Sequence, residues 1–308
     1  MNPTKMMAIA RRAAAVLLLA IPLSSFAAEQ KTFATPEAAV DALMAALKAD
    51  DDAAIVALFG DTHKDVVISP DRAANTATRA KLAAAMQTLR VLDERGPDQR
   101  VVLIGDQAWP VPIPLVREKG AWRFATEQGL DELINRRIGG NERNAIYVLR
   151  AYLDAQRQYA SRDRDGDNVL QYAQKLGSTA GKQDGLYWPA DAAKDGEQSP
   201  FGPLVAESAA YLKGHKEGDA YRGYHFKILT RQGKNAPGGA YNYVINGRMI
   251  AGFAMVAYPA QYGDSGIMTF IVSNNGRIYE KDLGRSSVSA GNAMTTFDPG
   301  PGWKELQD

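Results

Sequence analysis

The sequence has 308 residues, nearly balanced charge and no cysteine. Its 36 basic and 35 acidic side chains are scattered rather than clustered. Such a balance leaves no electrostatic footprint for nucleic acid or for an anionic membrane surface, so both partner classes are excluded. Without cysteine, disulfides and a cysteine-linked lipid anchor are excluded as well.

The first 27 residues have the pattern of a cleavable signal peptide. A basic start is followed by a short apolar run, Ala13 to Pro22, and by small residues at Ser25 and Ala27. The run is shorter than the roughly 20 residues of a transmembrane helix, and no other run of that length follows. We therefore expect a periplasmic protein without a membrane span, cleaved after Ala27. Cleavage removes three basic residues and leaves a net charge of −2.

A change in composition predicts two domains. All thirteen tyrosines lie at or after Tyr147, whereas the preceding part is rich in alanine. Paired glycines end helices, so we place the boundary at Gly139-Gly140. The expectation is an α+β protein with a signal peptide over 1–27 and domains over 28–139 and 140–308.

The first domain is expected to begin with helices and to continue as an antiparallel sheet. Thr35 can cap a helix that has Pro36 at its first position, and Val40 to Leu47 supply its apolar stripe. Lys119-Gly120 is suited to a hairpin turn. Further helices are expected around Ile55 to Phe59, Asn75 to Met86 and Asp131 to Ile138, and strands over Arg90–Glu94, Arg100–Ile104, Trp109–Glu118 and Trp122–Ala125.

This layout resembles the cone of nuclear-transport-factor-2-like (SnoaL-like) domains. The opening "TPEAAVDALMAALKADD" and the hairpin "VREKGAWRF" carry the resemblance. It implies a pocket inside a bent sheet, where the enzymatic members place acidic or histidine residues. The histidine of this domain, His63, stands in a polar stretch beside Asp61 and Asp65 and is expected to be a solvated loop residue.

The second domain is expected to pair a long helix with an antiparallel meander. The helix runs from Asn141 to Ala160, and alternating apolar residues then mark strands around Tyr224–Ile228, Phe253–Ala257 and Ile267–Val272. Asn275-Gly276 predicts a type I′ hairpin turn, and Asn246-Gly247 is a second candidate.

That order of elements resembles the head of a type II pseudopilin. "NERNAIYVLRAYLDAQRQYA" is similar to the helix that leads into such heads, and "YHFKILT" and "GFAMVAYP" are similar to their strands. The apolar N-terminal helix and the prepilin cleavage site are missing, so the resemblance implies no filament assembly.

Four longer stretches resemble a bacterial family of exported proteins catalogued as the domain of unknown function 2950 family. They are "GKQDGLYWP", "SPFGPLVAE", "GGAYNYVINGRMIAGFAMVAYPAQYG" and "TFIVSNNGRIYEKDLG". The resemblance implies an exported context and brings no reaction with it.

An acidic alternation is the candidate metal site. Asp163, Asp165 and Asp167 resemble the opening of a calcium loop, because calcium prefers several hard oxygen ligands. The EF-hand pattern fails, since Gln174 stands where a bidentate glutamate belongs. A solvated loop that ends the long helix is the favoured interpretation, and calcium is the one cofactor considered.

Gly263-Asp264-Ser265-Gly266 reproduces the tetrapeptide around the nucleophile of chymotrypsin-like proteases. That chemistry needs a histidine base and an acid that orients it, and the remaining motifs are missing. Because glycine and aspartate are typical of turns, Ser265 is expected to lie in a turn between two strands.

Aromatic residues form the candidate ligand surface, although packing in the core is the favoured role for them. They are Tyr187, Trp188, Tyr241, Tyr243, Tyr258 and Tyr262. His215 and His225 lack further ligands at metal spacing, and His225 is expected on the solvent face of a strand.

These observations favour a non-enzymatic binding or envelope-associated interaction module. Its partner would be a small ligand or an envelope protein. The alternative is a periplasmic hydrolase that uses the cone pocket or a metal at the Asp163 loop. A third possibility is a purely scaffolding role within an envelope complex. Convergent titratable groups in one concave site would favour the enzyme, whereas an apolar pocket without them would favour binding.

Overall fold

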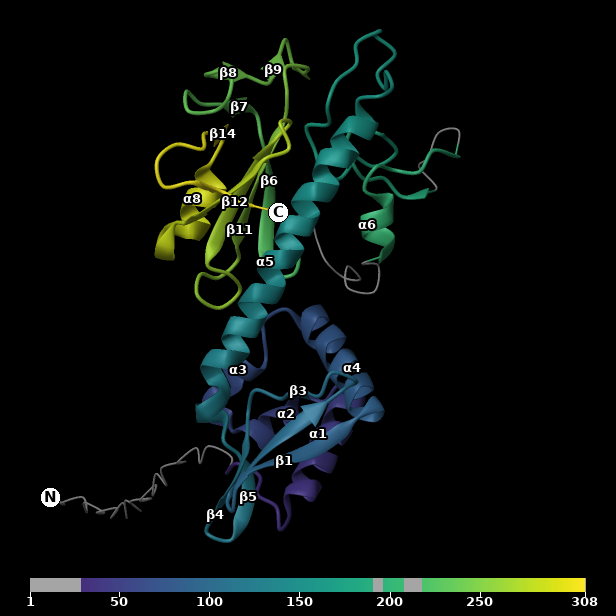
Figure 1. The fold of residues 1–308 in the computed structure, drawn as a ribbon. Coiled ribbons are helices and arrows are strands. Elements are labelled where there is room, and N and C mark those ends of the chain that lie inside the picture. The colour runs from purple at the N-terminus through teal and green to yellow at the C-terminus, as the bar shows by residue number, and fades with distance from the viewer. Residues whose placement is uncertain (1–28, 191–195, 208–217, 308) are drawn as a thin grey trace, which may run out of the picture.

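The computed structural model describes residues 29–190, 196–207 and 218–307. The protein is an α+β chain with two hydrophobic cores, joined by the long helix α5, Thr126–Tyr159 (Figure 1). Buried residues of the first core lie between Ala39 and Phe124, and those of the second between Ala145 and Phe297. The expected signal peptide and its cleavage site lie outside the described residues.

The first domain opens with the helices that the sequence predicts. Thr35 caps α1, and its hydroxyl accepts a hydrogen bond from the Ala38 N–H at 3.2 Å. Asp50 ends α1 in the left-handed region, and Asp51 then caps α2. The helices are α1 (Pro36–Ala49), α2 (Asp52–Phe59), α3 (Lys64–Val67) and α4 (Arg72–Thr88), with a short 3₁₀ turn, η1 (Asp61–His63), before α3.

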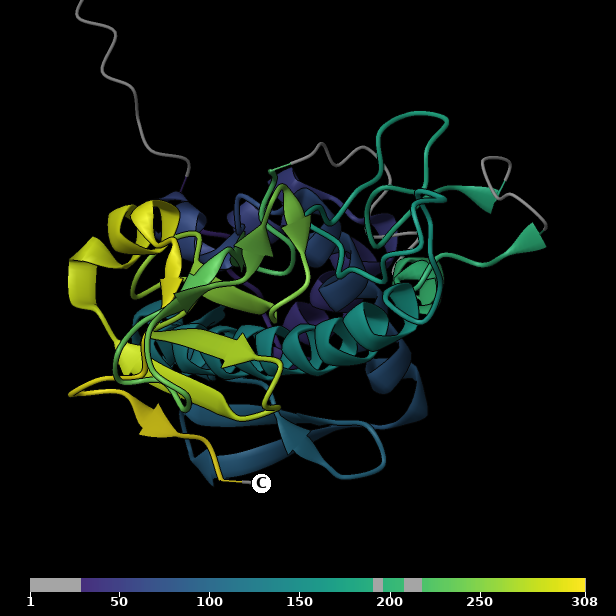
Figure 2. The same cartoon turned by 90° about the horizontal axis from the view of Figure 1, so that it is seen from above.

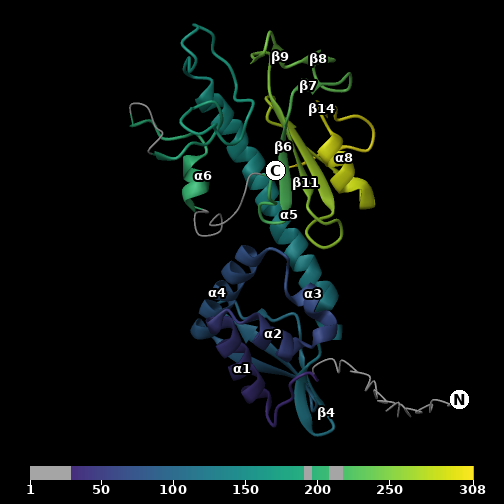
Figure 3. The same cartoon turned by 180° about the vertical axis from the view of Figure 1, so that it is seen from behind.

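The first sheet is antiparallel, and α1, α2 and α4 lie on one of its faces (Figures 1 and 3). Its order is β1-β2-β4-β5, with β3 paired to β2. Lys119 and Gly120 both have positive φ, as a type I′ hairpin requires. The strands are β1 (Arg90–Gly96), β2 (Gln99–Ile104), β3 (Trp109–Pro110), β4 (Leu115–Glu118) and β5 (Ala121–Phe124).

One strand expected over Trp109–Glu118 is two strands in the structure. Residues 111–114 between β3 and β4 are not in a strand. Pro110, Pro112 and Pro114 lack the N–H group that a sheet ladder needs, and this explains the interruption.

The expectation that Gly139-Gly140 ends a helix is wrong, because α5 passes through both glycines without interruption. Two glycines inside a helix cost roughly 1 kcal/mol each relative to alanine. Packing at both ends of α5 offsets this cost. Near its start the Thr126 hydroxyl donates to the Phe59 carbonyl at 2.6 Å, and near its end Tyr152 and Tyr159 are buried in the second core.

Gly129 fixes the first part of α5 against the first domain. A Cβ atom at this position would lie 2.5 Å from the Pro112 carbonyl oxygen, so the helix backbone packs directly on the β3–β4 connection. Farther along, the Arg136 guanidinium donates to the Pro110 carbonyl at 2.8 Å and lies 5.7 Å from the ring centre of Trp109. The helix therefore belongs to the cores of both domains.

The second sheet is an antiparallel meander that lies between two helices. Its order is β15-β13-β12-β11-β6, and every residue of β11 is buried. Helix α5 packs on one side and α8 (Ser287–Ala293) on the other (Figures 1 and 3). The strands are β6 (Tyr224–Leu229), β11 (Ala254–Pro259), β12 (Met268–Ser273), β13 (Ile278–Asp282) and β15 (Lys304–Glu305), and the 3₁₀ turn η4 (Gly284–Ser286) precedes α8.

The two Asn-Gly turns differ from each other. Asn246 and Gly247 both have positive φ and join β9 to β10 as a two-residue primed turn. At Asn275-Gly276 the hairpin is present, but only the glycine has positive φ, so the expected type I′ geometry is wrong there. The Gly276 N–H donates to the Ser273 carbonyl, which makes a longer loop with glycine at the left-handed position.

Short strands extend the far end of the second domain. Strand β7 pairs with β8 in antiparallel and with β14 in parallel fashion, so the chain is not purely antiparallel. The short strands are β7 (Arg231–Gln232), β8 (Tyr241–Asn242), β9 (Val244–Ile245), β10 (Arg248–Met249) and β14 (Thr296–Phe297).

An irregular segment after α5, which includes α6 (Gly202–Glu207), lies on the other side of α5 from the sheet (Figures 1 and 2). Arg164 anchors it. Its guanidinium makes two hydrogen bonds of 2.8 and 2.9 Å with the Glu197 carboxylate, and the Trp188 indole donates to the Glu197 carbonyl. The same guanidinium lies 4.7 Å from the Tyr159 ring centre and 5.2 Å from that of Trp188.

Candidate functional site

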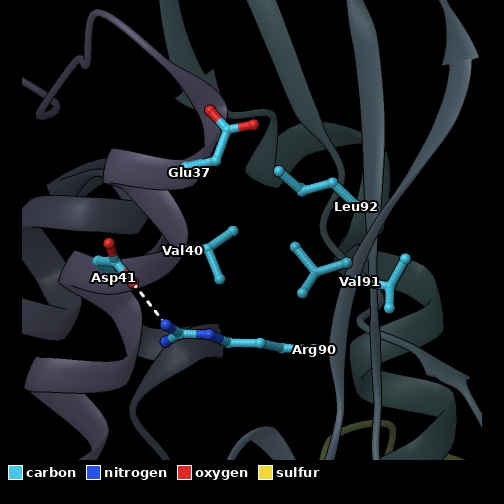
Figure 4. A pocket seen from close by; sticks show the side chains of 7 residues that line it. Glu37, Val40, Asp41, Arg90, Val91 and Leu92 are labelled. Atoms are coloured by element: carbon cyan, nitrogen blue, oxygen red, sulfur yellow. Dashed lines mark ion pairs between the residues drawn. The ribbon is translucent and has the colours of Figure 1, made fainter.

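A pocket in the first domain lies between helix α1 and the edge strand β1 (Figure 4). Its volume is about 350 Å³, within the range of small-ligand sites. It opens beside β1, the last strand in the sheet order, where α1 leaves the sheet uncovered. The lining residues are Glu37, Val40, Asp41, Arg90, Val91, Leu92 and Val102.

The floor of this pocket is apolar. Val40 of α1 is 5% exposed and Val102 of β2 is fully buried, and both belong to the core of the first domain. Leu92 pairs with Val102 across β1 and β2, so the two side chains share the inner face of the sheet. A ligand that enters here meets hydrocarbon at the bottom.

The charged groups stand at the rim. Arg90 reaches from β1 to α1, where its guanidinium forms an ion pair of 2.9 Å with the Asp41 carboxylate (Figure 4). Both side chains are substantially exposed, at 42% for Arg90 and 65% for Asp41. Glu37 lies one helical turn before Asp41, and its carboxylate has no ion-pair partner among the described residues. The rim therefore carries one negative charge in excess.

The titratable groups of the pocket are two carboxylates and one guanidinium, those of Glu37, Asp41 and Arg90. In the described part of the chain, its lining contains no serine, cysteine, lysine or histidine. His63 lies outside it, at the end of η1, and is half-buried rather than fully solvated. An apolar floor below an ion pair can hold the apolar body of a ligand and select the charge of its polar end.

The acidic loop uses its carboxylates within the protein. The Asp163 carboxylate accepts hydrogen bonds from the backbone N–H groups of Asp165, Gly166 and Asn168. These bonds, first of all that from Asn168, hold the pKa of Asp163 below its usual range. Asp167 forms an ion pair with Arg248.

The third carboxylate of the loop, that of Asp165, accepts a hydrogen bond from Gln171. Across residues 29–190, 196–207 and 218–307, no group of three or more histidine, aspartate or glutamate side chains is arranged to hold a metal ion. Calcium binding by Asp163, Asp165 and Asp167 thus stays a sequence-based prediction.

Ser265 lies in a turn, between β11 and β12. Its hydroxyl accepts from the Gln261 N–H at 2.9 Å and donates to the Gln261 carbonyl at 3.1 Å, and the residue is 8% exposed. The neighbouring Asp264 pairs with Arg137 of α5, and the Ser265 carbonyl accepts from the Asn141 amide at 2.9 Å. The tetrapeptide thus attaches the sheet of the second domain to the middle of α5.

The aromatic candidates do not form one surface. Trp188 and Tyr243 are fully packed in the second core, at 2% and 0% exposure. Tyr241 is exposed beside Tyr243 at one end of the domain, and Tyr187 is half-buried in the irregular segment. Tyr258, at the other end of β11, is almost buried, and burial raises its pKa.

Tyr262 and the histidines complete the candidates from the sequence. The Tyr262 hydroxyl donates to the Asp282 carboxylate at 3.2 Å. His225 does not simply face solvent, because its ring lies 5.4 Å from that of Tyr258 and lines a second pocket. His215 lies outside the described residues.

No pattern in the sequence marked the residues of the α1–β1 pocket as a site. Glu37 and Asp41 are four residues apart on the solvent side of a predicted helix, where charged residues are ordinary. Arg90 begins a strand whose distance from α1 depends on the tertiary fold. The one available signal was the expectation of a cone pocket, which named no residues.

No helix in the described part of the chain is long and apolar enough to cross a membrane. Helix α5 has the length, but charged and polar residues recur along it.

Comparison with known proteins gives a family and no activity. A family model described as "Protein of unknown function (DUF2950)" matches residues 30–306. No curated protein and no solved structure matches the chain. The match covers both domains and the helix between them, so the chain belongs to the DUF2950 family.

Proposed function

We propose that this protein is an exported, non-enzymatic ligand-binding module and that the α1–β1 pocket is a binding site. The observation that carries the proposal is the apolar floor of Val40, Leu92 and Val102 beneath a rim of exposed charges. Export rests on the signal-peptide pattern of residues 1–27.

The arrangement of the pocket supports binding over hydrolysis. General acid–base catalysis needs a titratable group aimed at the reacting atom, and covalent catalysis needs a nucleophile beside a base. Here the Asp41 carboxylate is paired with Arg90, the unpaired Glu37 carboxylate stands exposed at the same mouth, and the floor has no polar side chain. Burial of apolar surface is what this pocket offers a ligand.

The charge of the rim indicates the class of ligand. The Asp41–Arg90 pair is neutral as a unit, and Glu37 adds a carboxylate at the same opening. A molecule with a small apolar body and a cationic end satisfies both the floor and the rim. We therefore propose amphipathic amines as the class that this pocket prefers.

Calorimetric titration of the mature chain tests the proposal. Phenethylamine, 2-phenylethanol and phenylacetate share one apolar body and differ in charge. We expect phenethylamine to bind best and phenylacetate worst. Glu37→Gln should lower the affinity for phenethylamine by about fivefold, since an exposed ion pair is worth up to about 1 kcal/mol. Asp131→Asn, which removes an exposed carboxylate on α5 outside the pocket, is the matched control.

A second substitution tests the floor. Leu92→Trp should fill the pocket and abolish binding of all three compounds, whereas Leu82→Trp, on the exposed side of α4, should not. Equal affinity for phenethylamine in wild type and Leu92→Trp would contradict the site. Turnover of an ester substrate that is lost in Glu37→Gln would contradict a non-enzymatic role and favour the hydrolase.

A further inference from the structure

A second pocket lies in the second domain, on the side of the sheet that α8 covers. Its volume is about 470 Å³, and it is bounded by β6, β11, η4 and α8. Its polar lining comes from His225, Tyr258, Arg285, Ser289 and Asn292. Its lining differs from that of the α1–β1 pocket, where the floor is apolar and the rim acidic.

The base of the second pocket is held firmly. His225 and Tyr258 are direct neighbours across β6 and β11, and their rings lie 5.4 Å apart. Gly291 of α8 packs on the tyrosine, because a Cβ atom there would lie 2.3 Å from the Tyr258 ring. The Lys227 ammonium donates to the Asn292 carbonyl and ties the end of α8 to β6.

The described lining of this pocket carries the positive charge of Arg285, and no ion pair neutralises it. Arg285 lines it without an ion-pair partner anywhere in the described ranges. Among the described residues, no carboxylate belongs to its lining. The Asp282 carboxylate, three residues before Arg285, already accepts from the Gly284 N–H at 2.7 Å and from the Tyr262 hydroxyl.

His225 adds a further polar group. Its Nδ1 lies 3.2 Å from the Gly218 carbonyl oxygen, which can only accept, so Nδ1 carries the proton of that bond. The other ring nitrogen, Nε2, has no hydrogen-bond partner within the described part of the chain. Arg285, Nε2 of His225, the Ser289 hydroxyl and the Asn292 amide thus stand around one opening.

We infer that this second pocket binds a small organic anion. A guanidinium without a carboxylate partner is suited to a carboxylate or a phosphate group, which it binds through two parallel hydrogen bonds. The Ser289 hydroxyl already donates to the Ser286 carbonyl at 3.0 Å and can accept from a hydroxyl group of the ligand, whereas the Asn292 amide can donate or accept. The inference does not depend on the amine site in the first domain.

Calorimetric titration of the mature chain with citrate, glucose 6-phosphate and glucose tests this inference. We expect one or both anions to bind and neutral glucose not to bind. Citrate alone would identify a carboxylate site, glucose 6-phosphate alone a phosphate site, and both together a general anion site. Arg285→Gln should lower the affinity for the anion that binds by at least about tenfold.

Two further variants keep the test decisive. Ser289→Trp should block the pocket from an exposed helix position, and a melting curve will show whether it and the Arg285 variant remain folded. Arg231→Gln, an exposed arginine on β7 outside the pocket, is the matched control and should leave affinity unchanged. Failure of both anions to bind, or an equal loss in the Arg231 variant, would overturn the inference.

Discussion

The two domains both place helices against an antiparallel sheet, but they cover it to different extents. In the first, α1, α2 and α4 lie on one face and leave the edge strand β1 partly uncovered. In the second, α5 and α8 cover both faces, and β11 is buried throughout. Each pocket opens where a covering helix ends or falls short of the sheet.

This difference indicates how one chain can offer two selectivities. The pocket of the first domain keeps hydrocarbon at its floor because core residues of α1, β1 and β2 line it. The pocket of the second domain is polar, because it lies outside the hydrophobic core. Exposed residues of η4 and α8 line it. Cation and anion selectivity then follow from Glu37 in one and Arg285 in the other.

The largest expected effect tests whether the irregular segment belongs to the second core. Trp188→Ala should lower the free energy of unfolding by about 3–5 kcal/mol, because the side chain is 2% exposed and its loss leaves a cavity. Denaturant unfolding followed by circular dichroism will measure it. Tyr187→Ala, half-buried next door, should cost clearly less. A smaller loss at Trp188 than at Tyr187 would restore the aromatic-surface hypothesis.

Acid should weaken the ion pair that anchors the same segment. Hydrogen bonds from Arg164 hold the pKa of Glu197 below its ordinary value. A lowered folded pKa stabilises the protein above the unfolded pKa of about 4.3, and this stabilisation is lost as pH falls through the folded pKa. Glu197→Gln should therefore cost about 2 kcal/mol at pH 7.

The cost of Glu197→Gln should shrink as pH falls below about 4, because the wild-type carboxylate is then protonated as well. Unfolding curves of both proteins from pH 7 to pH 3 check this. A difference that stays constant over that range would show that the Arg164 pair does not stabilise the segment.

Ser265→Ala tests the turn between β11 and β12 that carries the attachment to α5. Loss of the two hydrogen bonds to Gln261 should cost about 1 kcal/mol. Thermal unfolding measures it, with Ser161→Ala, an exposed serine after α5, as control. Covalent labelling of Ser265 by a fluorophosphonate would contradict the turn and revive the protease hypothesis.

The smallest expected effect concerns the connection between the domains. Gly139→Ala and Gly140→Ala should each raise stability by about 0.5–1 kcal/mol, because alanine favours the helix more than glycine does. A Cβ atom meets no atom within 4 Å at Gly140 and only the end of Arg143, at 3.5 Å, at Gly139. A loss of stability in a thermal melt would show that α5 does not continue through the pair.

Local signals in the sequence predicted most of the secondary structure. Thr35 and Pro36 marked the start of α1, and Lys119-Gly120 marked a hairpin, because these residues act within a few positions of themselves. The helical glycine pair was mispredicted for the opposite reason. Its conformation is decided by cores that lie on either side, at Gly129 and beyond Ala145.

The residues that line the two pockets could not be predicted from the sequence. Arg90 and Asp41 form an ion pair although they are 49 positions apart in the chain. Arg285 and His225 line the same pocket and are 60 positions apart, so only the fold brings these groups together. The resemblances to cone-like and pseudopilin-like domains stay predictions. They anticipated the α+β class and the order of elements, but named no residue of either pocket.

Amide chemical shifts can show directly whether the two domains bind ligands of opposite charge. Amide spectra of the isotope-labelled mature chain should be recorded with phenethylamine and then with citrate or glucose 6-phosphate. We expect the amine to shift resonances around Val40 and Leu92, and the anion to shift those around His225 and Ser289. Shifts from both compounds in one pocket, or in neither, would contradict it.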